Sequence, residues 1–176
     1  YNLPDALDPD SLNVAKILQK NGYQTSLVGK WHLKKEPSGF DYYKVLPGQG
    51  LYNDPYFKTR ENWEDGSRGG LQENGFSADI IGDSSIDWLR KIDKDKPFFM
   101  MTHFKATHEP FDYPERHNSL NENVKFPEPE SLYEFDPNDS GRSHIGQIVE
   151  NLTERWQNDA KNEVKRYPGN PVDTEN

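Results

Sequence analysis

The chain has 176 residues, which is enough for one domain, but only 32% of them are hydrophobic, so we expect a thin core and many loops. The formal net charge of -9 and the lack of a Lys/Arg stripe argue against nucleic acid as a partner. The sequence has no cysteine, which excludes disulfides and thiolate zinc sites, and it has no apolar run of membrane-spanning length, so we expect no membrane partner.

The first predicted unit is a helix followed directly by a strand. Asp10 or Ser11 is suited to cap a helix whose apolar residues recur at helical spacing, and Gly22 ends it. The next run, Tyr23 to Val28, mixes β-branched, aromatic and small residues and predicts a strand.

That strand leads into Gly29-Lys30-Trp31-His32. If the backbone stays extended beyond the glycine, Lys30 and His32 point to one side and Trp31 to the other, which makes a compact cationic pair. A solvated lysine and an ordinary surface histidine fit the same spacing. The residues around the pair must decide between these interpretations.

The segment from Lys34 to Asn74 is predicted to be mostly loop because prolines and glycines interrupt it repeatedly. It carries seven scattered aromatic residues, which either stack on sugar rings or pin the loop to the body of the protein. These residues are Phe40, Tyr42, Tyr43, Tyr52, Tyr56, Phe57 and Trp63.

A second helix-to-strand unit follows. The apolar spacing predicts a helix from about Ser77 to Ile92, with Ser77 as its cap. The continuous apolar run Phe98 to Phe104 is typical of a strand buried on both faces of a parallel sheet. Like the first strand, it is followed by a lysine and a histidine, Lys105 and His108.

Two helix-to-strand units predict an α/β fold with a mainly parallel sheet. Ligands of such sheets bind at the carboxyl ends of the strands, so we expect Lys30, His32, Lys105 and His108 to lie there together. Lysine supplies a compact positive charge and histidine a proton near neutral pH, which suits a sulfate or phosphate ester. Lys30, Lys105 and His108 are the candidate substrate-binding residues.

A metal site is an alternative because His103 and His108 have the spacing His-x4-His. His103 lies within the apolar strand, where a hydrogen-bonded core histidine is the ordinary outcome, and no third ligand has suitable spacing. No metal ligand is therefore assigned in this sequence. Asp41 and Glu109 are unassigned carboxylates that also suit turns or surface positions.

The composition changes after Pro114, where proline and acidic residues dominate and predict an extended surface segment. Residues 144 to 156 have apolar residues at helical spacing and predict a last amphipathic helix. We accordingly divide the chain into residues 1 to 117, which carry the candidate site, and an insertion-like extension, residues 118 to 176, of the same domain.

The stretch around Lys30 also carries a family resemblance. Gly22-Tyr23-x-Thr25-x-x-x-Gly29-Lys30-Trp31-His32-Leu33 closely resembles the second signature of the formylglycine-dependent sulfatases. Other matching pieces follow in the family's order: Leu3-Pro4, Gly39-Phe40-Asp41, Pro97-Phe98-Phe99 and His108-x-Pro110. The run from His103 to Phe111 looks like the family's substrate-histidine loop. The resemblance covers about residues 1 to 117, and residues 127 to 144 look like an insertion of bacterial members.

The resemblance implies a partial fold of the alkaline-phosphatase type and hydrolysis of a sulfate ester through a sulfated formylglycine. We expect the substrates to be sulfated carbohydrates. The resemblance implies that Lys30 holds the sulfate and the formylglycine oxygen, that His32 hydrogen-bonds the formylglycine, and that His108 donates to the leaving oxygen. It also implies Ca²⁺ as a cofactor and a periplasmic or extracellular location for the parent protein.

The chain departs from the family in important places. The Cys-or-Ser-x-Pro-x-Arg motif of the nucleophile is absent, and so are the acidic pairs that hold the calcium. Lys34 stands where a glycine usually follows the signature, and Thr107 where proline often precedes the histidine. We therefore expect a central fragment that is inactive alone. The alternatives are a non-catalytic anion- or glycan-binding module and a phosphatase or phosphodiesterase of the same superfamily.

Overall fold

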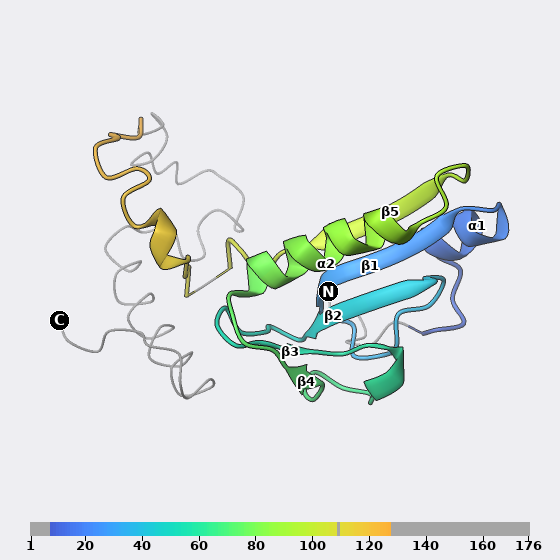
Figure 1. Cartoon of the computed structure of the whole chain (residues 1–176). Helices are drawn as coiled ribbons and strands as arrows, with labels where there is room; N and C mark the ends of the chain where they lie inside the picture. Colours follow the sequence, from blue (N-terminus) through green and yellow to red (C-terminus); the bar gives the residue numbers. More distant parts are fainter. Residues whose placement is uncertain (1–7, 109, 128–176) are drawn as a thin grey trace, which may run out of the picture. The chain divides into compact units, whose positions relative to one another are not determined.

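The computed structural model describes residues 8–108 and 110–127. The chain divides into two compact units, residues 1–112 and 113–176. The first unit is built on a three-stranded parallel sheet in the order β2-β1-β5 (Figure 1). Its strands are β1 (Gln24–Trp31), β2 (Tyr42–Pro47) and β5 (Phe98–His103). The predicted α/β fold with a parallel sheet is confirmed.

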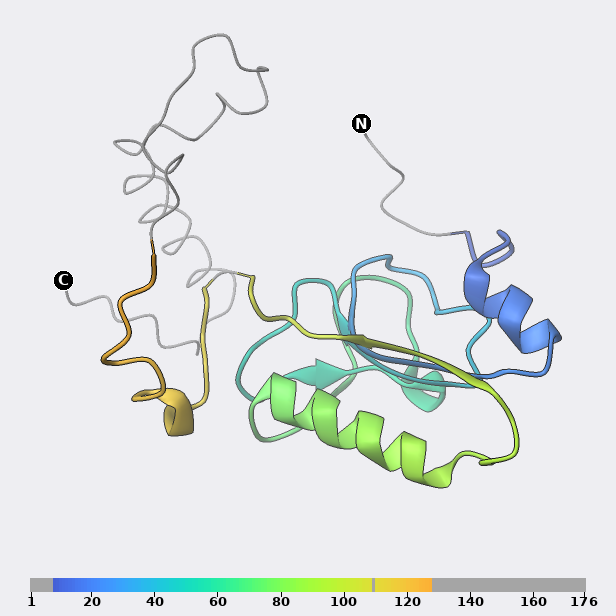
Figure 2. The same cartoon turned by 90° about the horizontal axis from the view of Figure 1, so that it is seen from above.

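Two helices cover opposite faces of this sheet, as Figure 2 shows in its edge-on view. They are α1 (Val14–Lys20) and α2 (Ser77–Lys91). Because side chains alternate along a strand, β1 sends Leu27 to a core cluster with Ala15 of α1, and Val28 to a cluster with Ile81 of α2. The core is two thin apolar layers, as the low hydrophobic content predicts.

Both predicted helix caps are wrong, the first by two or three residues and the second by one. The cap of α1 is Asn13, whose side chain accepts a hydrogen bond from the backbone N–H of Lys16 at 3.0 Å, so neither Asp10 nor Ser11 is needed. Ser77 is the first residue of α2 and is buried, while Phe76 occupies the cap position without a side-chain bond. Several polar residues precede each helix, and spacing alone does not choose among them.

The prediction that residues 34–74 are mostly loop missed β2, which pairs with β1 along its whole length. The segment also contains a small antiparallel pair, β3 (Tyr56–Phe57) and β4 (Leu71–Gln72), and a 3-10 turn at Arg60–Asn62. Lys44 interrupts the apolar run of β2, and this hides the strand from its composition. Phe40, Tyr43, Tyr52 and Phe57 are buried, so these aromatic residues pin the segment to the core.

The strand predicted at residues 98–104 is correct in position and parallel pairing but not in burial. β5 is an edge strand of the described sheet, and none of its residues is fully buried. Phe98 is 49% exposed. The continuous apolar run therefore identified a strand of a parallel sheet without the two covered faces that it predicted.

The second unit is described only from residue 113 to 127. It contains a 3-10 turn, Glu115–His117, and otherwise irregular, largely exposed backbone, in line with the predicted surface segment. The helix predicted at residues 144–156 lies outside the described residues, so the proposed division at residue 117 stays a prediction. Within the described part of the chain, no helix is long and apolar enough to cross a membrane.

Candidate functional site at the carboxyl edge of the sheet

The candidate residues follow from the register of the parallel strands. Gly29 of β1 pairs with His103 of β5, and Lys30 pairs with Leu46 of β2. All three strands therefore end at one edge of the sheet within a few residues of Lys30. The segments that follow β2 and β5 begin at that same edge.

Gly29 allows the strands to approach closely at this point. Its φ is +107°, and a Cβ added there would lie 1.9 Å from the carbonyl oxygen of His103. Only glycine fits this position. His103 Nδ1 lies 3.2 Å from the carbonyl oxygen of Lys30, so His103 is a hydrogen-bonded strand residue, as its apolar surroundings predicted.

Lys30 is the one cation of β1 and is half-buried. Its ammonium donates a hydrogen bond to Oε1 of Gln49, at 2.7 Å, from the loop that follows β2. Because an ammonium only donates, the amide oxygen of Gln49 must face Lys30 and the amide NH₂ group faces elsewhere. The contact orients the lysine without introducing a negative charge.

The turn after β5 carries the other two candidates. The backbone N–H of His108 donates to the carbonyl oxygen of Lys105 at 3.0 Å, which closes the turn. Lys105 is only 3% exposed, and its ammonium lies 4.8 Å from the ring centroid of Tyr52. The hydroxyl of Tyr52 donates to the carbonyl oxygen of His108 at 2.5 Å. Lys105 and His108 are thus held by one tyrosine.

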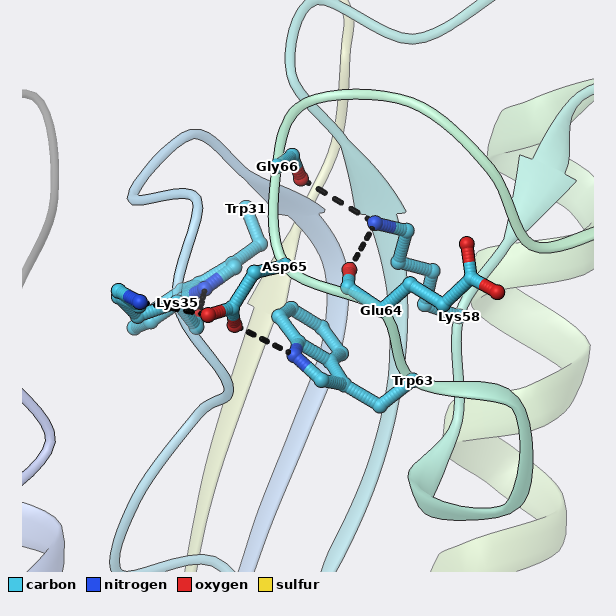
Figure 3. Close-up of polar contacts among 7 residues, drawn as sticks. All are labelled: Trp31, Lys35, Lys58, Trp63, Glu64, Asp65 and Gly66. Carbon is cyan, nitrogen blue, oxygen red and sulfur yellow. Dashed lines mark hydrogen bonds and ion pairs between the residues drawn. The ribbon is translucent and has the colours of Figure 1, made fainter.

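The segment that follows Lys30 is anchored by the contacts drawn in Figure 3. The indole N–H of Trp31 donates to the carbonyl oxygen of Lys35 at 2.7 Å. The ammonium of Lys35 pairs with Asp65 at 2.5 Å, and Asp65 also accepts from the indole of Trp63 at 3.1 Å. His32 lies inside the anchored segment and is itself exposed.

Lys58 holds the segment from Glu64 to Gly66, which contains Asp65 (Figure 3). It is fully buried, and its ammonium donates to the carbonyl oxygens of Glu64 at 2.5 Å and Gly66 at 3.2 Å. The ring of Trp63 lies 5.0 Å from the same ammonium. Burial lowers the pKa of Lys58, and Glu64 acts in the opposite direction. A buried lysine with these partners is structural.

The carboxylates do not assemble a metal site among residues 8–108 and 110–127. No group of three or more His, Asp and Glu side chains in these residues is suited to a metal ion. The alternative metal site at His103 and His108 therefore has no third ligand among them. Asp41 accepts hydrogen bonds from the backbone N–H of Thr25 at 2.8 Å and from Gln19 at 2.6 Å, which is a structural role. Glu109 lies outside the described residues.

Comparison with known proteins identifies the family. The sulfatase family model matches residues 2–158, which is most of the chain. The chain belongs to the sulfatase family. The resemblance of the Gly29-Lys30-Trp31-His32 stretch to a sulfatase signature thus agrees with a match that extends over both compact units.

Curated members of the sulfatase family are similar to parts of this chain. An N-acetylglucosamine-6-O-sulfatase of Bacteroides thetaiotaomicron is 44% identical over 128 residues, covering 71% of this chain and 22% of the relative. An arylsulfatase of Klebsiella aerogenes is 28% identical over 116 residues, covering 58% of this chain and 25% of the relative. The chain therefore spans about a quarter of the length of these sulfatases.

Solved structures agree with the fold. A protein in complex with its substrate D-glucosamine-2-N,6-O-disulfate is 37% identical, with a TM-score of 0.68, and the match covers 80% of this chain and 28% of that one. Ps i-CgsB, solved with k-i-k-neocarrahexaose, has a TM-score of 0.58 at 18% identity, over 94% of this chain and 40% of its own. Because its sequence identity is low, the similarity to Ps i-CgsB is evidence for the fold alone.

Sequence reasoning missed two residues at this edge, Gln49 and Tyr52. Gln49 stands between two glycines in a segment predicted as loop, and it gains meaning only when Tyr42–Pro47 is recognised as a strand that ends beside β1. Tyr52 was counted among the aromatic residues of that segment, but its contact with the turn after β5 spans 56 residues of sequence. No local pattern reports such a contact.

Proposed function

We propose that this chain is the central part of a sulfatase that hydrolyses a sulfate ester on a sulfated carbohydrate. The observation that carries the proposal is the parallel pairing of β1 with β5, which brings Lys30 and the turn from Lys105 to His108 to the same sheet edge. Family membership and the similarity to an N-acetylglucosamine-6-O-sulfatase support a sulfated amino sugar as the substrate class.

The residues of this chain would contribute positive charge and a proton. The ammonium of Lys30 binds a sulfate oxygen and offsets the charge on the transferring group. Lys105, in the turn that carries His108, is a second cation. His108 in its protonated form donates to the leaving oxygen as the bond between sulfur and that oxygen breaks, so the sugar departs as an alcohol rather than an alkoxide. Water supplies the oxygen that the released sulfate gains.

The donor-rich edge fits a formylglycine but not a calcium ion. Lys30 and His32 would hold the formylglycine oxygen, and that group supplies the nucleophile when it is present. The residue from which it forms would lie outside this sequence, which has no cysteine and no Cys-or-Ser-x-Pro-x-Arg motif. The described residues offer calcium no cluster of carboxylates, so the ligands of a calcium ion would lie outside them.

The test is sulfate release from N-acetylglucosamine-6-sulfate by the full-length protein. Lys30→Ala and His108→Ala should each lower kcat/KM by about 100-fold or more, because each removes a group that acts on the developing charge. Lys91→Ala, at an exposed position in the last turn of α2, is the matched control and should leave the rate unchanged. Equal rates for all four proteins would overturn the assignment of Lys30 and His108.

The two alternative functions give different results in the same experiment. An anion- or glycan-binding module would bind the sulfated sugar, lose binding in Lys30→Ala and release no sulfate. A phosphatase would release phosphate from the matching phosphate ester instead. We also propose a periplasmic or extracellular location, and recovery of the protein only in the cytoplasmic fraction of its source would contradict it.

A further inference from the structure

Tyr52 is fixed to the body of the first unit. Its side chain is 1% exposed, and its ring stacks on Phe76 with ring centroids 5.6 Å apart. Its carbonyl oxygen accepts the backbone N–H of Ser77, the first residue of α2, at 2.7 Å. Tyr52 is therefore tied to the start of a helix and has little freedom of its own.

The turn that Tyr52 contacts follows an edge strand, and three of its residues, Phe104, Ala106 and Thr107, are exposed. Tyr52 meets the turn at both ends: its ring lies beneath the ammonium of Lys105, and its hydroxyl donates to the carbonyl oxygen of His108. The same carbonyl oxygen also accepts the backbone N–H of Phe111 at 3.1 Å.

The contacts of Tyr52 with Lys105 and with His108 have different effects. The negative face of an aromatic ring attracts a cation, which offsets part of the cost of burying the ammonium of Lys105. The partly buried hydrogen bond of the hydroxyl fixes the backbone of His108, and through it the position of the imidazole. Proton donation to a leaving group depends steeply on such positioning.

We propose that Tyr52 is a positioning residue that holds the turn from Lys105 to His108 in the arrangement needed for proton donation by His108. The inference rests on the proposed function, in which His108 protonates the leaving oxygen. Tyr52 acts through these two residues and does not itself contact the substrate. Its role is separate from that of Lys30, which is oriented by Gln49.

Tyr52→Phe in the full-length protein isolates the hydroxyl, because phenylalanine keeps the ring under Lys105 and the stack on Phe76. The readout is kcat/KM on two sulfate esters, N-acetylglucosamine-6-sulfate and 4-nitrophenyl sulfate. A sugar alcohol is a poor leaving group that needs a proton, and nitrophenolate is a good one that does not. We expect a loss of about 10-fold or more for the sugar ester and less than about threefold for the aryl ester.

Two companion variants make the result specific. Tyr56→Phe removes a hydroxyl from an exposed tyrosine of β3 and should change neither rate. His108→Ala should show the same preference for the aryl ester in stronger form. If His108→Ala shows that preference and Tyr52→Phe does not, the role of Tyr52 is wrong and the proposed function stands. If His108→Ala affects both esters equally, the proposed function of His108 is wrong.

A second measurement does not require activity. Amide hydrogen exchange in the peptide that contains residues 104–108 should be at least about fivefold faster in Tyr52→Phe than in the wild type, because the turn loses an anchor. Exchange in β1 should be unchanged, which shows that the variant is folded. Unchanged exchange in residues 104–108 would overturn the proposal even if no substrate were cleaved.

Discussion

The ammonium of Lys30 contacts the side-chain amide of Gln49 rather than a carboxylate, so this contact places no negative charge beside the lysine. The distance of 2.7 Å between the ammonium of Lys30 and Oε1 of Gln49 suits a carboxylate equally well. A carboxylate at that position would compete with a sulfate oxygen for the lysine. A neutral partner orients the ammonium and adds no negative charge beside it.

Gln49→Glu tests this argument with an isosteric change. The new ion pair should weaken binding of anions, so we expect kcat/KM for the sulfate ester to fall by about 10- to 100-fold and inhibition by inorganic sulfate to weaken by a similar factor. Gln49→Ala is the matched control, and it should cost less than about tenfold because it removes one hydrogen bond and adds no charge. Equal losses of kcat/KM in Gln49→Glu and Gln49→Ala would contradict a role for the neutral charge of Gln49.

The pairing of β1 with β5 depends on Gly29. A methyl group at this position would collide with the carbonyl oxygen of His103, and the positive φ would strain any other residue. Gly29→Ala should therefore lower the free energy of unfolding by about 2 kcal/mol or more. Gly82→Ala, in α2 with nothing within 4 Å of the added Cβ, should instead raise it by about 0.5–1 kcal/mol.

Urea denaturation of the full-length proteins measures both glycine variants on one scale. The two substitutions add the same methyl group, so their opposite signs would separate local geometry from the chemical change. Destabilisation by Gly29→Ala that does not exceed that of an average surface substitution would mean that the two strands can move apart without cost. The close approach of β1 and β5 would then not require a glycine at position 29.

Tyr43 gives β2 a measurable pH dependence. Burial, followed by its hydrogen bond of 2.5 Å to Glu36, raises the pKa of Tyr43 well above its ordinary value of 10.0. Above pH 10 the unfolded chain loses this proton while the native state keeps it, so stability should fall as the pH rises.

Tyr43→Phe should make that fall shallower by up to about 1.4 kcal/mol per pH unit. The measurement is urea denaturation at pH 9, 10 and 11, with Tyr56→Phe as the control at an exposed position. The slope that remains in Tyr43→Phe would include Tyr42, whose pKa burial also raises. Identical slopes for the wild type and Tyr43→Phe would contradict the burial of Tyr43.

The sequence predicted those helices and strands whose residues show a clear local pattern. The strand that contains Val28, the helix from Ser77 and the apolar run from Phe98 were predicted near their observed bounds. The helix shows apolar residues at helical spacing, and the two strands show local composition typical of a strand. β2 was missed because Lys44 and the surrounding prolines and glycines mask its pattern. The position of Lys30 near the end of β1 followed from the sequence, but its contact with Gln49 did not, since that contact exists only after β2 has formed beside β1.

The chain as a whole holds only part of a sulfatase. It covers 22% of the length of the N-acetylglucosamine-6-O-sulfatase and 28% of the chain solved with glucosamine disulfate. The cations and the histidine of the proposed site lie in these 176 residues, whereas the nucleophile motif is absent from them. We therefore predict that the isolated chain releases no sulfate from any sulfate ester, and turnover by the purified 176-residue chain would contradict this.

The most direct test compares two esters of one sugar. The full-length protein is incubated with N-acetylglucosamine-6-sulfate and with N-acetylglucosamine-6-phosphate, and the inorganic anion released is measured by ion chromatography. We predict sulfate release that falls by about 100-fold or more in Lys30→Ala, with little phosphate release. Release of phosphate in preference to sulfate, or sulfate release that Lys30→Ala leaves unchanged, would contradict the assignment of this sheet edge to sulfate-ester hydrolysis.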